Sequence, residues 1–495
     1  MSMTPASSRY FNQVAAEWDT IRSGYFGEAV REAAIARSYL LPGMVVADVG
    51  AGTGFIAAGL APRVQRVHVI DGSPAMLEVA RRNLAGFDNM VYHLGESSAL
   101  PLPDASLDAV FANMVLHHCP DPLQAIREMV RLLKPGGRLV ITDMDTHPHG
   151  WFKDEMADVW LGFERNQVRD WFKQADLVNV IVDCTGQSCC AQSQDPTIVD
   201  AQGREARVSL FVATGTRRLA MRDGVREAYS TAASSSGCGC SSGETSSCGC
   251  SSPGNSQASC CGEAEQAQSQ GTSNATAYYT PEEIAAVPAE AGEFSLACGN
   301  PIAMAALRPG EVVLDIGSGG GLDSFLAASR VGPAGKVIGV DMTPAMLERA
   351  RATAANNNIQ NVEFRQGQAE ALPVDAGQVD VIISNCVINL VEDKGQVFQE
   401  AFRVLKPGGR LEVSDVVTSR PFPLDARANG EAWSGCVSGA LPEQEYLDLI
   451  SQAGFTAVQV RRSQAAGKNG DVDLYSAIVS AVKPIQTSQP SCGCG

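Results

Sequence analysis

Short apolar runs alternate along the chain with segments whose apolar residues recur at helical spacing. In the first half, four runs have the length of a strand and stop at a glycine or a polar residue: residues 45–49, 66–70, 108–112 and 139–142. Continuous apolar runs of this kind are typical of parallel strands that are buried on both faces. Residues 122–133 instead place Ile126, Met129 and Leu133 on one side, which predicts an amphipathic helix.

The second half repeats this order of elements. Its predicted strands are residues 312–316, 336–340, 362–364, 379–383 and 410–413, and residues 395–405 form the predicted helix before the last of them. Alternating strands and helices predict an α/β fold, with a doubly wound, Rossmann-like parallel sheet in each half.

A polar cassette follows the predicted strands in both halves. In the first half it comprises Asp48, Gly50, Gly52, Gly54, Asp71 and the Lys-Pro-Gly-Gly-Arg run 134–138. In the second half it comprises Asp315, Gly317, Gly319, Gly321, Asp341 and the same run at 406–410. Matching positions lie 267, 270 and 272 residues apart, and so steady an offset indicates two domains of one fold in tandem.

The length and local composition predict where these domains begin and end. A chain of 495 residues is too long for one core and is expected to form two or three domains. We expect a first domain at 1–218, a linker at 231–274, a second domain at 275–484 and a cysteine-containing tail at 485–495. The linker is rich in Ser, Gly and Gln and poor in aliphatic residues, so it cannot form a core.

Charge and cysteine content limit the classes of function. The net charge of −17 disfavours nucleic acid or an anionic membrane as the main partner, because phosphate binding requires a basic face. No apolar run is long enough to span a bilayer, and no signal peptide is recognised at the start; we therefore expect a cytoplasmic protein. In a reducing compartment, 15 cysteines indicate thiol chemistry or soft-ion binding rather than a disulfide framework.

The glycine-rich loops predict two cofactor sites. Glycines let the backbone approach a ligand closely, and the following helix offers free N–H groups. The acid at the next strand end, Asp71 or Asp341, can accept hydrogen bonds from both ribose hydroxyls. The spacing resembles that of class I S-adenosylmethionine methyltransferases, which implies S-adenosylmethionine as cofactor, with Met342 and Asn385 as further contacts. The alternative is that one or both loops are ordinary turns in an inactive copy.

Five further motifs lie in the second half, over roughly the last two-fifths of the chain. They are Tyr-Tyr-Thr-Pro-Glu-Glu-Ile-Ala-Ala-Val at 278–287, Cys-Gly-Asn-Pro at 298–301, Val-Asp-Met-Thr-Pro at 340–344, Ser-Asn-Cys-Val-Ile-Asn-Leu at 384–390 and Gly-Cys-Val-Ser-Gly-Ala at 435–440. Together they resemble the arsenite methyltransferase family.

The resemblance implies a set of arsenic ligands. The matching cysteines are Cys298, Cys386 and Cys436, and either Cys260 or Cys261 takes the place of a fourth family cysteine before the domain. Ala297 is a departure, since many relatives have glycine there. The alternative is that the three cysteines are ordinary buried core residues.

The chemistry of trivalent arsenic agrees with this interpretation. Arsenic is soft, so thiolates are suitable ligands, and its lone pair can attack a sulfonium methyl group without loss of a proton. The resemblance implies methylation of arsenite to mono- and dimethylated arsenicals, with thioredoxin or glutathione as the thiol reductant. Two alternatives remain: a fusion whose first domain methylates another small molecule, and a thiol-rich protein that sequesters metalloids.

Histidines and cysteines in the first half and in the linker can each be interpreted either as functional or as structural residues. His117 and His118 lie after a predicted strand and could be general bases, although histidines in such loops are more often structural. Cys184, Cys189 and Cys190 could form a soft-ion site or be incidental thiols. The linker's Cys-Gly-Cys pairs are closer than the pairs typical of zinc sites and suggest thiol exchange or metalloid capture.

Overall fold

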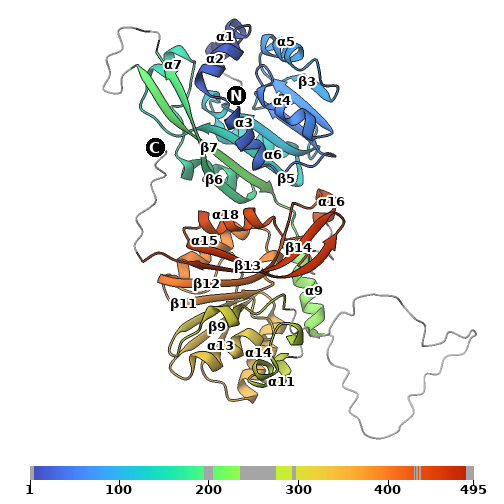
Figure 1. The fold of residues 1–495 in the computed structure, drawn as a ribbon, viewed down its shortest axis with the longest axis vertical. Helices are drawn as coiled ribbons and strands as arrows, with labels where there is room; N and C mark the ends of the chain where they lie inside the picture. The colour runs from blue at the N-terminus through green and yellow to red at the C-terminus, as the bar shows by residue number, and fades with distance from the viewer. Residues whose placement is uncertain are drawn as a thin grey trace, which may run out of the picture.

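Two similar α/β units are stacked end to end along the long axis of the molecule (Figure 1). The computed structural model describes residues 5–193, 195, 204–234, 275–292, 297–428, 430, 433 and 436–485. Each unit contains one seven-stranded sheet with helices on its faces. No helix among these residues is long and apolar enough to cross a membrane.

The first sheet has the strand order β3-β2-β1-β4-β5-β7-β6. Its strands are β1 (Val45–Val49), β2 (Arg66–Asp71), β3 (Met90–Leu94), β4 (Leu107–Asn113), β5 (Leu133–Met144), β6 (Leu177–Gln192) and β7 (Glu205–Arg217). The helices are α1 (Pro5–Val14), α2 (Trp18–Tyr25), α3 (Glu28–Ala36), α4 (Phe55–Leu60), α5 (Pro74–Asn83), α6 (Pro122–Leu132), α7 (Trp151–Glu155) and α8 (Arg165–Gln174), with short 3-10 turns η1 (Ala61–Arg63) and η2 (Leu116–His118).

The second sheet has the equivalent order β10-β9-β8-β11-β12-β14-β13. Its strands are β8 (Val312–Ile316), β9 (Lys336–Asp341), β10 (Val362–Gln366), β11 (Val379–Asn385), β12 (Leu405–Thr418), β13 (Thr456–Asn469) and β14 (Val472–Val482). The helices include α10 (Pro281–Ala285), α11 (Ala289–Gly292), α12 (Pro301–Ala305), α13 (Leu322–Val331), α14 (Pro344–Asn356), α15 (Lys394–Val404), α16 (Leu424–Arg427) and α18 (Glu443–Gln452), with 3-10 turns η3 (Ala275–Ala277) and η4 (Ile388–Leu390).

The predicted doubly wound fold is confirmed in both halves. Five strands of each sheet are parallel, and the last two form an antiparallel hairpin that the apolar runs did not predict. β5 and β12 also begin earlier than predicted, because the Lys-Pro-Gly-Gly runs continue the strand through a register shift instead of preceding it.

The repeated lysine of that run has the same structural partner in both halves. Lys134 binds Asp108 at 2.7 Å, and Asp108 also accepts the N–H of Val45 at 2.7 Å. In the second half Lys406 binds Asp380 at 2.8 Å, in the same register. Asp380 likewise accepts the N–H of Val312 at 2.9 Å. The repeated motif therefore helps to join β1 with β4, and β8 with β11, at the end of the sheet opposite the glycine loops.

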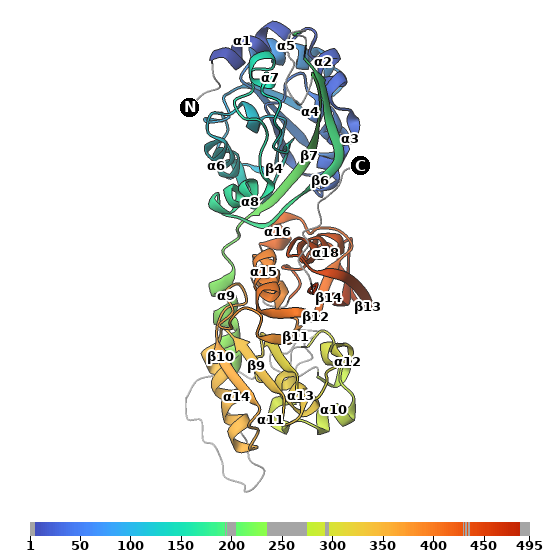
Figure 2. The same cartoon turned by 90° about the vertical axis from the view of Figure 1, so that its left-hand side faces the viewer.

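A helix outside both sheets connects the two units. α9 (Arg222–Ser234) leaves β7 and runs beside α14 of the second unit (Figure 2). Glu392 accepts the backbone N–H groups of Leu219 and Ala220 at 3.2 and 3.1 Å, just before this helix begins. Residues 231–234, predicted as linker, are thus helical. We propose that the first domain ends near 218 and that α9 belongs to the second.

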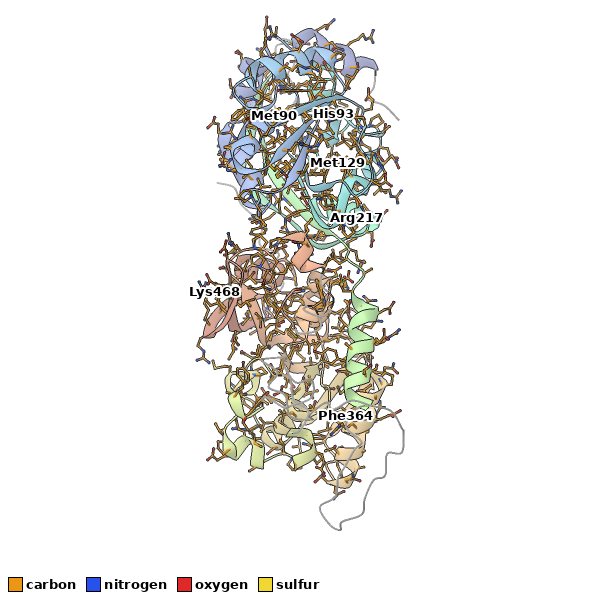
Figure 3. All side chains as sticks on the ribbon, turned by 90° about the vertical axis from the view of Figure 1, so that its right-hand side faces the viewer. Met90, His93, Met129, Arg217, Phe364 and Lys468 are labelled. Atoms are coloured by element: carbon orange, nitrogen blue, oxygen red, sulfur yellow. The ribbon has the colours of Figure 1, made fainter. Side chains whose placement is uncertain are left out.

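The junction between the units contains a buried ion pair. Arg138, from β5, donates to Glu445 of α18 at 2.7 Å, and the two residues are only 8% and 3% exposed. Asn179, in β6, accepts the N–H of Lys394 at 2.9 Å and thereby caps α15 across the junction. Arg217 marks the point at which the chain leaves the first sheet for the second unit (Figure 3).

We predict that Glu445→Ala destabilises the protein by about 3 kcal/mol, because it leaves the guanidinium of Arg138 buried without its carboxylate. Chemical denaturation of the full chain measures this loss. Replacing both partners by methionine should cost less than the single change, since no charge then remains buried. Glu363→Ala serves as the control, because the pair of Glu363 with Lys336 is exposed and should contribute no more than about 1 kcal/mol. An equally small effect of Glu445→Ala would contradict a stabilising junction.

Candidate functional site

The carboxyl ends of three adjacent parallel strands meet at one edge of the second sheet. β8 lies between β9 and β11, and the chain turns from β8 into α13 through Gly317, Gly319 and Gly321. All three glycines have left-handed backbones, with φ of 76°, 50° and 95°. A Cβ on Gly317 would lie 2.2 Å from a methyl carbon of Val387. The loop therefore requires glycine both for its conformation and for its close contact with the turn after β11.

Two acids define the cofactor side of this edge. Asp341 accepts the N–H groups of Gly319 at 3.0 Å and Thr343 at 2.8 Å, so its carboxylate is fixed at the rim. Asp315 is buried and accepts the hydroxyl of Ser324 at 2.6 Å. Burial, together with the nearby charge of Asp323, raises the pKa of Asp315 to about 8. A cationic ligand would relieve this cost by favouring the carboxylate.

All but one of the predicted cofactor residues of the second half line one cavity, which is bounded by Asp315, Gly317, Gly319, Asp341, Met342 and Asn385, among others. The exception is Gly321, which caps the start of α13. A carboxylate at the rim and a second buried carboxyl suit a ligand with a diol and a cationic amine. S-adenosylmethionine has both groups, so these residues fit it.

The three predicted thiols pack together, and Cys386 lines this cavity. Cys386 follows β11 directly and has a left-handed backbone, with φ of 60°. Cys436 donates its thiol to the carbonyl of Cys386 at 2.8 Å. Cys298 reaches the carbonyl of Ser414 at 3.4 Å. The sulfur atoms of Cys298 and Cys386 and a carboxylate oxygen of Asp415 lie within 4.8 Å of one another.

The thiols are buried among mainly apolar side chains. Cys298, Cys386 and Cys436 are 7%, 8% and 5% exposed and pack with Val416, Phe422, Ala440, Val472 and Leu474. The pKa of Cys386 is raised well above its ordinary value, first by hydrogen bonds with the other two thiols and then by burial. Burial also raises the pKa of Cys298. Both thiols are therefore protonated at neutral pH in the absence of a ligand.

Asn385 lines the cavity but its amide is used mainly for structure. Its oxygen accepts the N–H of Cys298 at 3.1 Å. Its nitrogen donates to Tyr279 at 2.8 Å and to the carbonyl of Gly299 at 2.9 Å. The residue thus ties the segment before the sheet to the end of β11, and this places Cys298 beside Cys386. Cys260 and Cys261 lie outside the described residues.

Two residues of α9 belong to this site and were not predicted. Tyr229 and Arg222 line the same cavity, and the hydroxyl of Tyr229 forms a hydrogen bond with the thiol of Cys436. Burial, followed by the two nearby thiols, raises the pKa of Tyr229 well above its ordinary value. The sequence did contain a sign of this helix. Val225 and Tyr229 are four residues apart, just before the predicted linker, and residues at that spacing share one face of a helix.

The first half forms an equivalent cofactor edge. Gly50, Gly52 and Gly54 are left-handed, with φ of 67°, 54° and 91°. Asp71 accepts the N–H groups of Gly52 at 2.7 Å and Ser73 at 2.8 Å, and burial raises its pKa to about 6. The buried carboxyl of Asp48 accepts the N–H of Ala57 at 2.9 Å, and burial raises its pKa to about 7. Asp48, Gly50, Gly52 and Asp71 line one cavity, while Gly54 begins α4 behind them.

The cysteines of the first half do not assemble into a second thiol site. Cys184, Cys189 and Cys190 all lie along β6. Cys189 is buried whereas Cys190 is exposed, because successive residues of a strand point to opposite faces. Among the described residues, the first half gathers three potential metal-binding groups only at His117, His118 and Asp158.

Comparison with known proteins gives the family. The family description "Methyltransferase domain" matches residues 47–141 and, in a second form, residues 307–454. An arsenite methyltransferase of Halobacterium salinarum is 45% identical over 218 residues, which are 43% of this chain and 55% of the relative. An arsenite methyltransferase of Aquipseudomonas alcaligenes is 39% identical over 202 residues, with 38% and 58% covered.

Two further relatives extend the comparison. A demethylmenaquinone methyltransferase of Lactococcus lactis is 43% identical over 172 residues, with 30% of this chain and 68% of the relative covered. The crystal structure of an arsenic(III) S-adenosylmethionine methyltransferase of Chlamydomonas reinhardtii is 36% identical, with 42% and 75% covered and a TM-score of 0.38. The chain spans somewhat more than half the length of the arsenite methyltransferases named above.

These matches confirm the expected relation to the arsenite methyltransferases and the expected cofactor. One methyltransferase match falls on each of the two cofactor edges. The chain therefore belongs to the S-adenosylmethionine-dependent methyltransferases, with one methyltransferase domain in each half.

Proposed function

We propose that the second domain methylates trivalent arsenic and that it holds the arsenic by the thiolates of Cys298, Cys386 and Cys436. The observation that carries this proposal is the packing of three buried thiols from segments far apart in the sequence, one of which, Cys386, lines the cofactor cavity. The names of the arsenite methyltransferase relatives support the choice of substrate. The biological role we propose is arsenic detoxification.

Arsenite can bind to the protein thiols without an external base to take up their protons. Arsenite is present in neutral water as As(OH)3. Each protein thiol replaces one hydroxyl, so that an As–S bond forms, an As–O bond breaks, and the thiol proton leaves with that hydroxyl as water. Raised thiol pKa values therefore do not oppose binding, because no proton has to be released to solvent.

Methyl transfer to arsenic then depends on alignment of the reacting atoms and not on acid–base catalysis. The bound cofactor supplies an electrophilic methyl group on its sulfonium sulfur. The arsenic lone pair forms the new As–C bond as the S–C bond breaks, and no proton leaves the arsenic. The residues of the site hold the arsenic in line with the methyl group and exclude water, for which Val416, Phe422 and Leu474 provide the apolar wall.

Each transfer formally oxidises arsenic from the trivalent to the pentavalent state. Two electrons from a pair of thiols, which become a disulfide, return it to the trivalent state for a second methylation. We propose that Cys260 or Cys261 and a thiol reductant such as thioredoxin or glutathione take part in this step. Mono- and dimethylated arsenicals are then the products.

Sequestration of metalloid without catalysis is less well supported. Such a protein would need the thiols but not the left-handed glycine loop or the fixed carboxylate of Asp341.

We predict that Cys386→Ser and Cys436→Ser each remove arsenite methylation, because both thiolates are needed to hold the arsenic beside the methyl group. Cys298→Ser should still methylate a monomethylated trivalent arsenical, which has one fewer open position for a ligand. Arsenic speciation of the products measures these outcomes. Cys190→Ser is the matched control, because this thiol is exposed in the first half. Full activity of Cys386→Ser would refute the assignment.

We predict that Asp341→Ala weakens binding of S-adenosylmethionine to the second domain by roughly 1.5–3 kcal/mol, since the ribose hydroxyls lose a charged acceptor. Calorimetry of the full chain should show one tight site in place of two, and arsenite methylation should be lost. Asp71→Ala should remove the other site and leave arsenite methylation intact. If Asp71→Ala alone abolished arsenite methylation, the assignment of the reaction to the second domain would be wrong.

We predict that Tyr229→Phe raises the KM for arsenite several-fold with a smaller change in kcat, because Cys436 loses the hydroxyl that orients its thiol. Steady-state kinetics with arsenite as the varied substrate separates the two constants. An unchanged KM would show that the hydrogen bond does not position the thiol.

A further inference from the structure

The first domain has a substrate pocket of a different kind from the thiol site. The cavity at its cofactor edge is bounded on one side by Asp48, Gly50 and Asp71. On the other side it is lined by aromatic rings from α1, α2 and the segments near them: Tyr10, Phe11, Trp18, Tyr25, Phe26, Phe55 and Phe152. Such a lining suits a flat, apolar ligand.

The two domains can be compared residue by residue at the turn after the central strand. Asn113 pairs with Thr142 as Asn385 pairs with Ser414. The next residue is left-handed in both, with φ of 56° at Met114 and 60° at Cys386. Its N–H donates to the carbonyl of Thr142 or of Ser414, at 2.8 Å in each case. Met114 therefore occupies the place of Cys386, and a thioether has no proton to exchange for an As–S bond.

A carboxylate occupies equivalent positions in both domains but has different partners. Asp143 and Asp415 each follow the residue that accepts this N–H. Asp415 accepts the hydroxyl of Tyr446 at 3.2 Å. Asp143 instead lies 2.7 Å from Nδ1 of His117. Asp143 therefore fixes the imidazole ring of His117 through Nδ1 and leaves Nε2 on the edge of the ring that faces away from Asp143. His117 also lines the aromatic pocket.

One oxygen of a second carboxylate in the pocket lacks a hydrogen-bond partner. Asp158 is 6% exposed, and its Oδ1 lies 3.8 Å from Nε2 of His117 and 3.7 Å from Nδ1 of His118. Its Oδ2 is buried with no hydrogen-bond partner in the described part of the chain. A buried carboxylate oxygen without a donor is costly, so this atom indicates a ligand that brings an N–H or O–H donor into the pocket.

We propose that the first domain is a second, independent methyltransferase, which methylates a hydroxyl group on an aromatic small molecule with His117 as the general base. The ligand lies among the aromatic rings, its hydroxyl donates to Nε2 of His117, and a second donor group of the ligand meets Oδ2 of Asp158. The hydroxyl proton moves to Nε2. The oxygen lone pair forms the C–O bond as the S–C bond of the cofactor breaks, and the imidazolium then returns its proton to solvent.

The charges around His117 set the pH at which it can act as a base. Burial lowers its pKa, but the carboxylates of Asp143 and Asp158 outweigh burial and raise the pKa to about 9. The imidazole is therefore mostly protonated at neutral pH and becomes an effective base as the pH rises toward 9, not far below the ordinary pKa of a phenol, ~10. This contrasts with the thiol site, where arsenic attacks through a lone pair and no base is required.

The test uses the full chain with Asp341→Ala, which weakens the second cofactor site. Transfer of a tritiated methyl group from S-adenosylmethionine to 2-naphthol and to hydroquinone is measured at pH 9, where a large share of the imidazole is neutral. We expect methyl ethers as products. His117→Gln should lower the rate with both phenols on the order of 100-fold or more, and Asp158→Asn should lower the rate with hydroquinone, whose second hydroxyl can donate to Oδ2.

His93→Gln is the matched control. His93 lies on β3, contacts His68 at 2.8 Å and does not line the pocket, and Figure 3 shows it in the first domain beside Met90. It should leave the rate unchanged. Calorimetry with S-adenosylhomocysteine verifies that the His117 and Asp158 variants retain a folded cofactor site.

Four results would overturn the proposal. They are the absence of transfer to either phenol, a rate unaffected by His117→Gln, a product methylated on ring carbon, and loss of the activity on removal of a stoichiometric metal ion. The last result would show that His117, His118 and Asp158 bind a metal instead of moving a proton.

Discussion

The left-handed turn after the central strand is the constraint on which both sites depend. The N–H of the residue in this turn is held by the carbonyl of the neighbouring strand, at 2.8 Å in each domain. The side chain of that residue therefore stands at the carboxyl edge of the sheet, beside the glycine loop that approaches the cofactor. Ligands of doubly wound folds bind at this edge. Cysteine at the position gives the centre of a thiol site, and methionine leaves an aromatic pocket.

The other two thiols depend on contacts that reinforce this turn. Cys436 bonds to the carbonyl of Cys386, and Asn385 draws Cys298 to the same place. α9 adds Tyr229 from a segment that follows the first domain directly, and Glu392 accepts the N–H groups at its start. Because Glu392 also borders the cofactor cavity, the connection between the domains and the second active site share one carboxylate. The two domains are thus joined structurally, although the proposed chemistries are separate.

Local features of the fold were predictable from the sequence, whereas the long-range ones were not. The parallel strands were recognisable because their apolar runs are continuous, and the glycine loops because their conformation excludes other residues. The antiparallel pair β6 and β7 carries polar and exposed positions at its outer end, so its sequence matched neither the continuous apolar run of a buried strand nor a clear apolar–polar alternation.

Contacts between residues far apart in the sequence could not be predicted. The contact of Tyr229 with Cys436 joins residues on opposite sides of the linker. Family motifs identified the three cysteines, but the network of Asn385 that brings Cys298 to the others is visible only in three dimensions. The Arg138–Glu445 pair had no local signal at all, since its partners lie 307 residues apart.

Diffraction at the arsenic absorption edge from crystals of the full chain with arsenite tests the central claim most directly. The account predicts a strong anomalous peak in bonding contact with the sulfur atoms of Cys298, Cys386 and Cys436, on the side of the cavity that faces Asp315 and Asp341. Arsenic bound elsewhere, with these three sulfur atoms unliganded, would contradict it.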